Sequence, residues 1–328
     1  NGYTIAHGLH DQSGALLPVF FPSFGDYKSA AFSYALAPAF AVFGPSVGVA
    51  RAVAAGLGLA TVLLVGLLGY RRAGPWIGLA AAVGAGLTPW LFQLGRLAFD
   101  TSAFPFAVAL VFLAADVWAR GGRHLFLRSA ALGGSLGFLT YVYSAGRLFG
   151  PLLAAALVLF VRRVPWRALA AAWLAYAVFL IPLALYRLRH PSGITARYHE
   201  TAFPMQGMSL PGIAGHAFVN YLHDLNPWHW VVSGDRKPYV DIWGAPQLLA
   251  VVAVLAAVGV VEICRRRDRF WLYVLAAYLL SAVPASLTID RHHSLRLAAM
   301  PVCVVVLAIP GLEAVARLRR PAMVVAAC

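Results

Sequence analysis

The feature that most constrains this chain is the recurrence of apolar stretches long enough, or nearly long enough, to cross a bilayer as helices. About 20 helical residues span a hydrocarbon core of about 30 Å. The chain is therefore predicted to fold as an all-α polytopic transmembrane helix bundle. The nine predicted spans are 51–70, 75–93, 98–118, 126–143, 147–161, 166–186, 246–264, 270–287 and 295–315.

Arginines fill alternate gaps between these stretches. Successive arginine clusters are always separated by two predicted spans, so all of them lie on one side of the membrane. The positive-inside rule makes that side cytoplasmic. The five clusters are Arg71/Arg72, Arg120/Arg123/Arg128, Arg162/Arg163/Arg167, Arg265/Arg266/Arg267/Arg269 and Arg317/Arg319/Arg320.

Composition excludes a water-soluble fold and argues against nucleic acid as a partner. Hydrophobic residues make up 61% of the chain and charged residues 12%, whereas soluble domains carry about 25% charged residues. The net charge is +14, but 15 of the 26 Lys and Arg residues lie in or beside the five arginine-rich gaps. They do not form a single basic face, so no nucleic-acid partner is expected.

The predicted topology divides the chain into four segments. Residues 1–50 form a first extracytoplasmic loop, 51–187 a set of transmembrane helices, 188–245 a second extracytoplasmic loop and 246–328 further transmembrane helices. The chain begins without Met and ends in an apolar run of eight residues after Arg320. We therefore expect a fragment that lacks at least one helix before Asn1 and one or more after Cys328.

Two shorter segments in the extracytoplasmic loops are also predicted to be helical. The apolar stretch 29–43 has only about 15 residues and is expected to lie in the membrane interface, with a true span as the alternative. A helix after Pro211 is amphipathic. We expect its polar side, including His216, Asn220, His223 and Asp224, to face water; the alternative is that this side contacts substrate. Gly133 and Gly137 predict close packing between helices.

Ionisable residues concentrate on the predicted outer side, which receives eight of the twelve acidic residues and nine of the ten histidines. Three clusters stand at ends of apolar stretches: 11–28, 96–100 and 288–296. An ionisable residue held near the bilayer is a functional candidate. The alternative for each cluster is ordinary capping or snorkelling at the interface.

These clusters carry a resemblance to a known family. The matching positions are Gly8 to Gly14, Pro18, Phe21 to Lys28, Tyr34, Phe43-Gly44, Arg51, Pro89, Gly95 to Asp100, Pro284, Thr288, Asp290, His293 and Arg296. In this order they resemble the bacterial branch of the membrane-embedded GT-C glycosyltransferases, relatives of the protein O-mannosyltransferases and of the lipid A aminoarabinose transferase. The similarity runs through nearly the whole chain.

The resemblance implies an enzyme of the bacterial inner membrane that works on the periplasmic side. It would move a sugar from a polyprenyl-phosphate-linked donor to a glycan, lipid or protein acceptor. The family's principal acid is expected before Asn1, so this fragment is not expected to catalyse transfer alone. The implied residues are Asp100 and Asp11 for catalysis, Lys28, Arg296, His293 and Arg147 for the lipid phosphate, and Asp26, Arg96 and Asp290 in support.

Some features depart from the family pattern or leave alternatives open. The family's Lys-Pro-Pro-Leu is Lys28-Ser29-Ala30-Ala31 here, which removes two rigid prolines. No cofactor is certain, although His199-Glu200 could contribute to a divalent metal site. A transporter or flippase is one alternative; it predicts inverted repeats and charges at mid-membrane, for which the chain gives no convincing sign. A non-catalytic relative of the transferases is the other.

Overall fold

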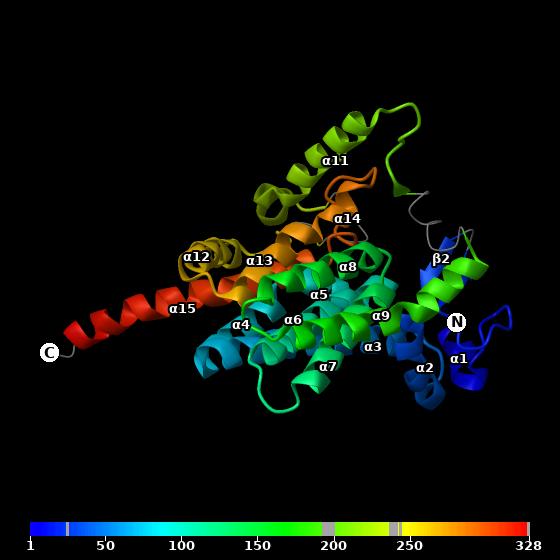
Figure 1. The fold of residues 1–328 in the computed structure, drawn as a ribbon, viewed down its shortest axis with the longest axis horizontal. Coiled ribbons are helices and arrows are strands. Elements are labelled where there is room, and N and C mark those ends of the chain that lie inside the picture. The colour runs from blue at the N-terminus through cyan, green and yellow to red at the C-terminus, as the bar shows by residue number, and fades with distance from the viewer. Residues whose placement is uncertain (24–25, 192–200, 236–241, 243–244, 327–328) are drawn as a thin grey trace.

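The computed structural model describes residues 1–23, 26–191, 201–235, 242 and 245–326. The chain is almost entirely helical, with one two-stranded hairpin near its start (Figure 1). The first elements are α1 (Gly2–Gly8), β1 (Phe20–Ser23), β2 (Asp26–Ser29) and α2 (Ala31–Phe43). The hairpin is antiparallel and pairs Phe21 with Lys28.

A bundle of longer helices follows. Six helical segments among the described residues are long and apolar enough to cross a membrane, or seven if a bent pair counts as one. The six are α3 (Val47–Ala73), Asp100–Ala119, α7 (Leu125–Val142), α9 (Trp166–Arg189), Arg269–Ser286 and Met300–Leu318. The prediction of an all-α membrane helix bundle is therefore confirmed, although the number of long spans is lower than predicted.

Several of these spans combine shorter elements. Asp100–Ala119 joins η1 (Asp100–Ala103) to α6 (Phe104–Ala119), and Arg269–Ser286 joins α13 (Arg269–Ser281) to α14 (Val283–Ser286). Met300–Leu318 belongs to α15 (Met300–Ala326). The predicted stretch 295–315 begins five residues too early, because turns precede Met300.

Three of the nine predicted spans differ from straight membrane-length helices. The stretch 75–93 is divided into α4 (Pro75–Leu87) and α5 (Pro89–Arg96), bent by 62°. The bend falls at Thr88, whose extended backbone fits a residue that precedes proline. The stretch 147–161 becomes α8 (Gly146–Ala156) and η2 (Leu157–Phe160), and 246–264 becomes α12 (Ala250–Arg266), with 17 residues.

Close helix contacts depend on glycine. A Cβ atom at Gly133 would clash with the Ala172 carbonyl, and one at Gly137 would clash with the Phe179 side chain. The predicted close packing of this small-residue pair is thus confirmed, between α7 and α9. A Cβ atom at Gly259 of α12 would likewise clash with the carbonyl of Leu307 in α15.

The segment predicted to lie in the interface forms a helix that is too short to span. With 13 residues, α2 is about 20 Å long at 1.5 Å per residue. It packs against α1 and, together with the hairpin, forms a small cluster with Ile5, Phe21 and Ala37 in its core. The alternative of a true span at 29–43 is therefore not supported.

The amphipathic helix after Pro211 is α11 (Leu210–Leu225), and its orientation is opposite to the one predicted. Its polar residues Asn220 and Asp224 are buried, whereas Phe218 and Leu222 are more than half exposed. The side-chain amide of Asn220 donates hydrogen bonds to the carbonyls of Ser286 and Thr288, so the polar side serves to attach α11 to the bundle. In Figure 1, α11 lies on the outside of the bundle, over α14.

Candidate functional site

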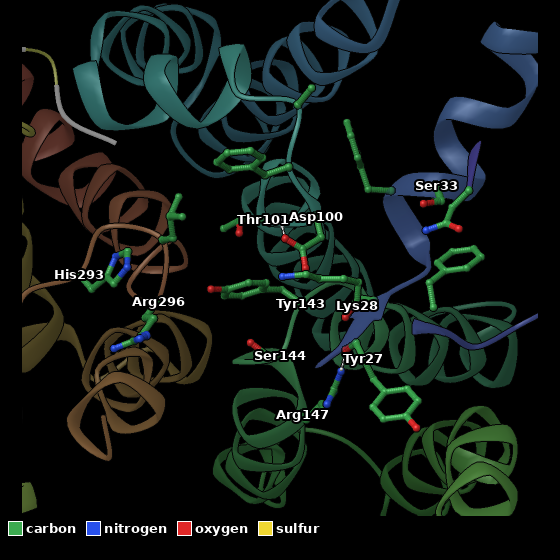
Figure 2. A pocket seen from close by; sticks show the side chains of 17 residues that line it. Tyr27, Lys28, Ser33, Asp100, Thr101, Tyr143, Ser144, Arg147, His293 and Arg296 are labelled. Carbon is green, nitrogen blue, oxygen red and sulfur yellow. Dashed lines mark hydrogen bonds between the residues drawn. The ribbon is translucent and has the colours of Figure 1, made fainter. Parts of the chain in front are cut away.

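One cavity collects most of the predicted site residues. It has a volume of about 470 Å³ and lies between the hairpin, the start of α2, the turn 98–101, the turn 143–147 and the loop before α15 (Figure 2). We call it the site cavity. Its ionisable residues include Lys28, Asp100, Arg147, His293 and Arg296.

Lys28 enters this cavity from strand β2. The pairing of Lys28 with Phe21 fixes its place in the hairpin, and Phe21 is almost fully buried in the small cluster below. Figure 2 shows the Lys28 side chain extending toward Asp100 near the middle of the cavity. The hairpin therefore holds this cation at the site even though the family's two prolines are absent.

Asp100 is the first residue of η1, at the start of the Asp100–Ala119 span. The Thr101 backbone N–H donates a hydrogen bond of 3.0 Å to its carboxylate. A carboxylate at this position is favoured by the positive end of the helix dipole. Asp100 is the one acidic side chain among the described residues that line the site cavity.

Arg147 joins the hairpin to α8. Its Nη2 donates a hydrogen bond of 3.4 Å to the Tyr27 carbonyl, and its guanidinium lies 4.4 Å from the centre of the Phe20 ring. A cation held over an aromatic face in this way loses little freedom when it binds an anion. Arg147 is thus anchored to the same hairpin that carries Lys28.

Arg296 and His293 approach from the opposite wall, in the loop before α15 (Figure 2). Arg296 forms an ion pair of 3.1 Å with Asp290, and only 12% of its side chain is exposed. Its Nη1 is buried and has no hydrogen-bond partner among the described residues. An unsatisfied buried guanidinium N–H is costly, and a bound anion would satisfy it.

The cavity as a whole carries excess positive charge. Three permanent or near-permanent cations, Lys28, Arg147 and Arg296, accompany the single carboxylate of Asp100. The Asp290 carboxylate neutralises part of this charge from behind Arg296. Such an arrangement suits an anionic group next to a hydroxyl that requires a base.

The remaining predicted site residues lie elsewhere. Asp11 lines a neighbouring cavity of about 380 Å³ rather than the site cavity. Arg96 is exposed and does not line the site cavity. Asp290 does not line the site cavity but forms an ion pair with Arg296, which does. The side chain of Asp26 lies outside the described part of the structure, as do His199 and Glu200.

Asp11 has a local role in its turn. Its Oδ1 accepts hydrogen bonds from the Ser13 N–H, the Ser13 hydroxyl and the Ala15 N–H, at 2.7 to 2.9 Å. Burial pushes the pKa of this carboxyl upward, but these hydrogen bonds outweigh burial and hold the pKa below its ordinary value. Asp11 is therefore an ionised, strongly hydrogen-bonded residue of the loop.

Several polar residues of the cavity were not predicted. Tyr27, Thr101, Tyr143 and Ser144 all line it. Tyr143 and Ser144 come four and three positions before Arg147, at the outer end of a predicted span. This closeness to Arg147 could have predicted that Tyr143 and Ser144 line the same cavity, because residues at one end of a span lie at the same depth in the membrane.

A second polar cluster lies behind the loop that carries Arg296. The Asp224 carboxylate of α11 accepts a hydrogen bond of 2.8 Å from the His292 N–H, and His292 Nε2 lies 2.9 Å from Gln247 Oε1. Burial raises the pKa of Asp224 to about 7 and lowers the pKa of His292 to about 4. We call Asp224, His292, Gln247, Asp235 and Ser294 the packed cluster.

Metal ligands do not converge within the described part of the chain. No group of three or more His, Cys, Asp or Glu side chains there could hold a metal ion. The residues that suggested a metal, His199 and Glu200, lie outside that part, so the metal prediction is not tested.

Comparison with solved structures identifies the fold. The chain is similar to ArnT from Cupriavidus metallidurans in the apo state, with a TM-score of 0.55 and 15% identity over 87% of this chain. It is also similar to the same protein bound to undecaprenyl phosphate, with a TM-score of 0.60 and 14% identity over 94% of this chain. The chain therefore shares the polytopic helical fold of these two structures.

The chain spans about half the length of the solved structures, 49% and 54%. No model of a known protein family matches the chain. No curated protein matches its sequence.

Proposed function

We propose that this protein is a membrane glycosyltransferase that uses a polyprenyl-phosphate-linked sugar as its donor. The observation that carries the proposal is the convergence of Lys28, Arg147 and Arg296 with Asp100 in a single cavity. The likeness in fold to a protein solved with undecaprenyl phosphate supports the choice of donor. We further propose that the cavity opens to the periplasmic side of a bacterial inner membrane.

The donor phosphate would lie among the three cations. When the sugar leaves, negative charge develops on the phosphate oxygens, and fixed guanidinium groups stabilise that charge most effectively. Arg296 has an unsatisfied buried N–H to offer, and Arg147 is already anchored over Phe20. Lys28 supplies a compact charge from the hairpin, on the side of the cavity nearest Asp100.

Asp100 would act on the acceptor. The acceptor hydroxyl oxygen forms a bond to the anomeric carbon, and the bond from that carbon to the phosphate oxygen breaks. The electron pair of the broken bond stays on the lipid phosphate, while the hydroxyl proton passes to the Asp100 carboxylate. Such a proton transfer by a positioned base commonly contributes about 10²–10⁴-fold to the rate.

The test is binding of undecaprenyl phosphate to the purified protein in detergent, measured by native mass spectrometry or by quenching of tryptophan fluorescence. The wild-type protein should bind the lipid, and Arg296→Met should weaken binding at least about tenfold, because a charge-assisted hydrogen bond contributes about 1.5–3 kcal/mol. Arg187→Met is a matched control, since Arg187 is exposed and lines neither the site cavity nor its neighbour.

Two results would contradict the proposal. One is an absence of lipid binding by the wild-type protein; the other is an equal loss of binding in Arg187→Met and Arg296→Met. A transfer assay with a radiolabelled polyprenyl-phosphate sugar then separates enzyme from binding protein. Lipid binding without transfer, in the longest natural form of the chain, would favour the non-catalytic relative.

A further inference from the structure

A second cationic cavity lies at the other end of the bundle. The span that begins at Asp100 in the site cavity has 20 residues and ends at Ala119, about 30 Å away along the helix. Ala119 lines a cavity of about 280 Å³ between α3, α6, the segment after η2 and the start of α13. We call it the arginine cavity, because four of its lining residues are Arg72, Arg120, Arg163 and Arg269.

Two of these arginines are held in place by neighbours. The buried Asp116 carboxylate forms ion pairs with both Arg72 and Arg120, at 2.5 and 3.1 Å. The Arg72 guanidinium also lies 3.9 Å from the centre of the Phe270 ring, and Arg120 donates a hydrogen bond to the Arg71 carbonyl. The geometry of this part of the cavity is therefore fixed before any ligand arrives.

The other two arginines have no acidic partner. Among the described residues, no carboxylate lies within ion-pair distance of Arg163 or Arg269. Asp268 lines the cavity, but its Oδ1 already accepts hydrogen bonds from the Phe270 and Trp271 N–H groups at the start of α13. Cations thus outnumber acids around this space.

The excess can be counted. Asp116 also pairs with Arg71, at 2.9 Å. Five arginines, at positions 71, 72, 120, 163 and 269, therefore accompany two carboxylates, Asp116 and Asp268, which leaves a net charge of +3.

The positive-inside rule alone does not account for this arrangement. That rule requires basic residues near one membrane face, but it does not require them to surround a cavity. A second arginine group at the same end shows the difference: Arg265, Arg266 and Arg317 each pair with Glu262 or Glu313. Every arginine of that group has an acidic partner, whereas Arg163 and Arg269 have none among the described residues.

The cavity also lies at the depth of lipid headgroups. Trp76 and Trp166 are 80% and 72% exposed, and they lie at the N-terminal ends of α4 and α9, beside the Arg71/Arg72 and Arg162/Arg163/Arg167 clusters. Exposed tryptophans at helix ends mark the interface between lipid and water. Basic pockets between transmembrane helices on the positively charged side are suited to anionic lipid headgroups.

We propose that the arginine cavity binds a phosphate-bearing anion, namely the headgroup of an anionic phospholipid. The phosphate would accept hydrogen bonds from Arg163 and Arg269, with Arg72 and Arg120 as a fixed cationic floor. Guanidinium groups bind phosphate through paired N–H donors, which suits a rigid site of this size. Inorganic phosphate shares this chemistry and is the other source of such an anion.

The experiment compares phosphatidylglycerol with phosphatidylcholine as bound lipids of the intact protein, by native mass spectrometry after exchange from detergent. The wild-type protein should retain phosphatidylglycerol at least about tenfold better. The double variant Arg163→Gln/Arg269→Gln should lose most of this preference. Because neither side chain has an acidic partner, the variant is expected to fold, which unfolding curves in the same detergent will check.

The matched control is Arg123→Gln/Arg162→Gln, which removes the same charge at the same end but outside the cavity. It should keep the wild-type preference. An unchanged preference in the first double variant, or an equal loss in the control, would overturn the proposal in favour of a diffuse basic surface. Binding of inorganic phosphate alone that is lost in the first variant would support the same site with a soluble anion as its source.

Discussion

The loop that precedes α15 has two sides with opposite roles. His293 and Arg296 face the site cavity, whereas their neighbours His292 and Ser294 belong to the packed cluster. On the packed side, Ser294 donates two hydrogen bonds of 2.8 Å to Asp235, from its N–H and its hydroxyl. Adjacent residues of similar polarity are therefore divided between a cavity and a scaffold.

Asp100 and Asp224, the carboxylates that lie on these two sides, also differ in their exposure to open space. Asp100 lies in an open cavity beside Lys28, whereas Asp224 is completely buried between α11 and the loop. Removing a charge from water is costly, so burial raises the pKa of Asp224 to about 7 even though Arg296 and Arg291 favour the charged form. A polar residue at the membrane rim thus indicates function only when it also faces open space.

Asp100→Asn should have the largest effect, and it should lower the rate of sugar transfer without weakening lipid binding. We expect the transfer rate of the longest natural form of the chain to fall by about 10²–10⁴-fold, since the amide cannot take the acceptor proton. Undecaprenyl phosphate binding should change little, because the three cations remain. The rate is measured under single-turnover conditions with a radiolabelled donor.

The matched control for this prediction lies on the packed side. Asp224→Asn removes a buried carboxylate of α11 that does not line the site cavity, so its transfer rate should stay near wild type. If both variants lost the rate equally, the division between cavity and scaffold would be wrong.

The fold was largely predictable because the bilayer imposes strong rules. The helical bundle and the close packing at Gly133/Gly137 each depend on a few neighbouring residues, and both agree with the structure. The prediction was wrong where tertiary packing determines where a helix bends or ends. The bend at Thr88 and the division of 147–161 into α8 and η2 depend on local proline and on packing partners that hydropathy does not report.

The site was predictable in part. Lys28, Asp100, Arg147, His293 and Arg296 line one cavity, because each lies near the end of an apolar stretch, whereas the roles that the resemblance implied for them stay a prediction. The orientation of α11 was wrong, since an amphipathic pattern indicates two faces but not which one is buried. Nothing in the sequence showed that His293 lines a cavity while His292 is packed in the interior. The two residues are adjacent and identical, and only the backbone conformation of the loop separates their side chains.

Asp224→Asn should change the pH dependence of stability. The folded state keeps the Asp224 proton up to a pH of about 7, whereas the unfolded carboxyl loses it near 3.8. The wild-type protein should therefore lose stability relative to Asp224→Asn as pH rises from about 4 to about 7. A shift of about 3 pKa units corresponds to at most about 4 kcal/mol.

Burial of His292 changes stability with pH in the opposite direction. Its folded pKa is about 4, below its ordinary 6.5, so its contribution to stability grows as pH rises through this window. The two slopes partly cancel in the wild-type protein, and Asp224→Asn should reveal the His292 slope. Unfolding is followed in detergent by tryptophan fluorescence at pH 4.5, 6 and 7.5. A gap between wild type and variant that is constant with pH would contradict the burial argument.

Asp235→Ala should lower stability by about 2–3 kcal/mol. The substitution leaves the buried Ser294 N–H without its acceptor, and an unsatisfied buried donor costs about 1–3 kcal/mol. Ser294→Ala removes only the hydroxyl and should cost less. Urea or thermal unfolding in detergent measures both. A larger loss in Ser294→Ala than in Asp235→Ala would assign the stabilisation to the Gln247 contact instead.

The smallest effect is expected where the two sides meet, at the ion pair of Asp290 with Arg296. The Asp290 carboxylate is 34% exposed, and partly exposed pairs contribute about 1 kcal/mol or less. Asp290→Asn should therefore barely change stability. Undecaprenyl phosphate should bind about two- to threefold more tightly, because Arg296 loses a competing anion. A tenfold weaker affinity, measured by the same titration, would instead show that Asp290 is needed to hold Arg296 toward the cavity, and would place Asp290 among the positioning residues of the site.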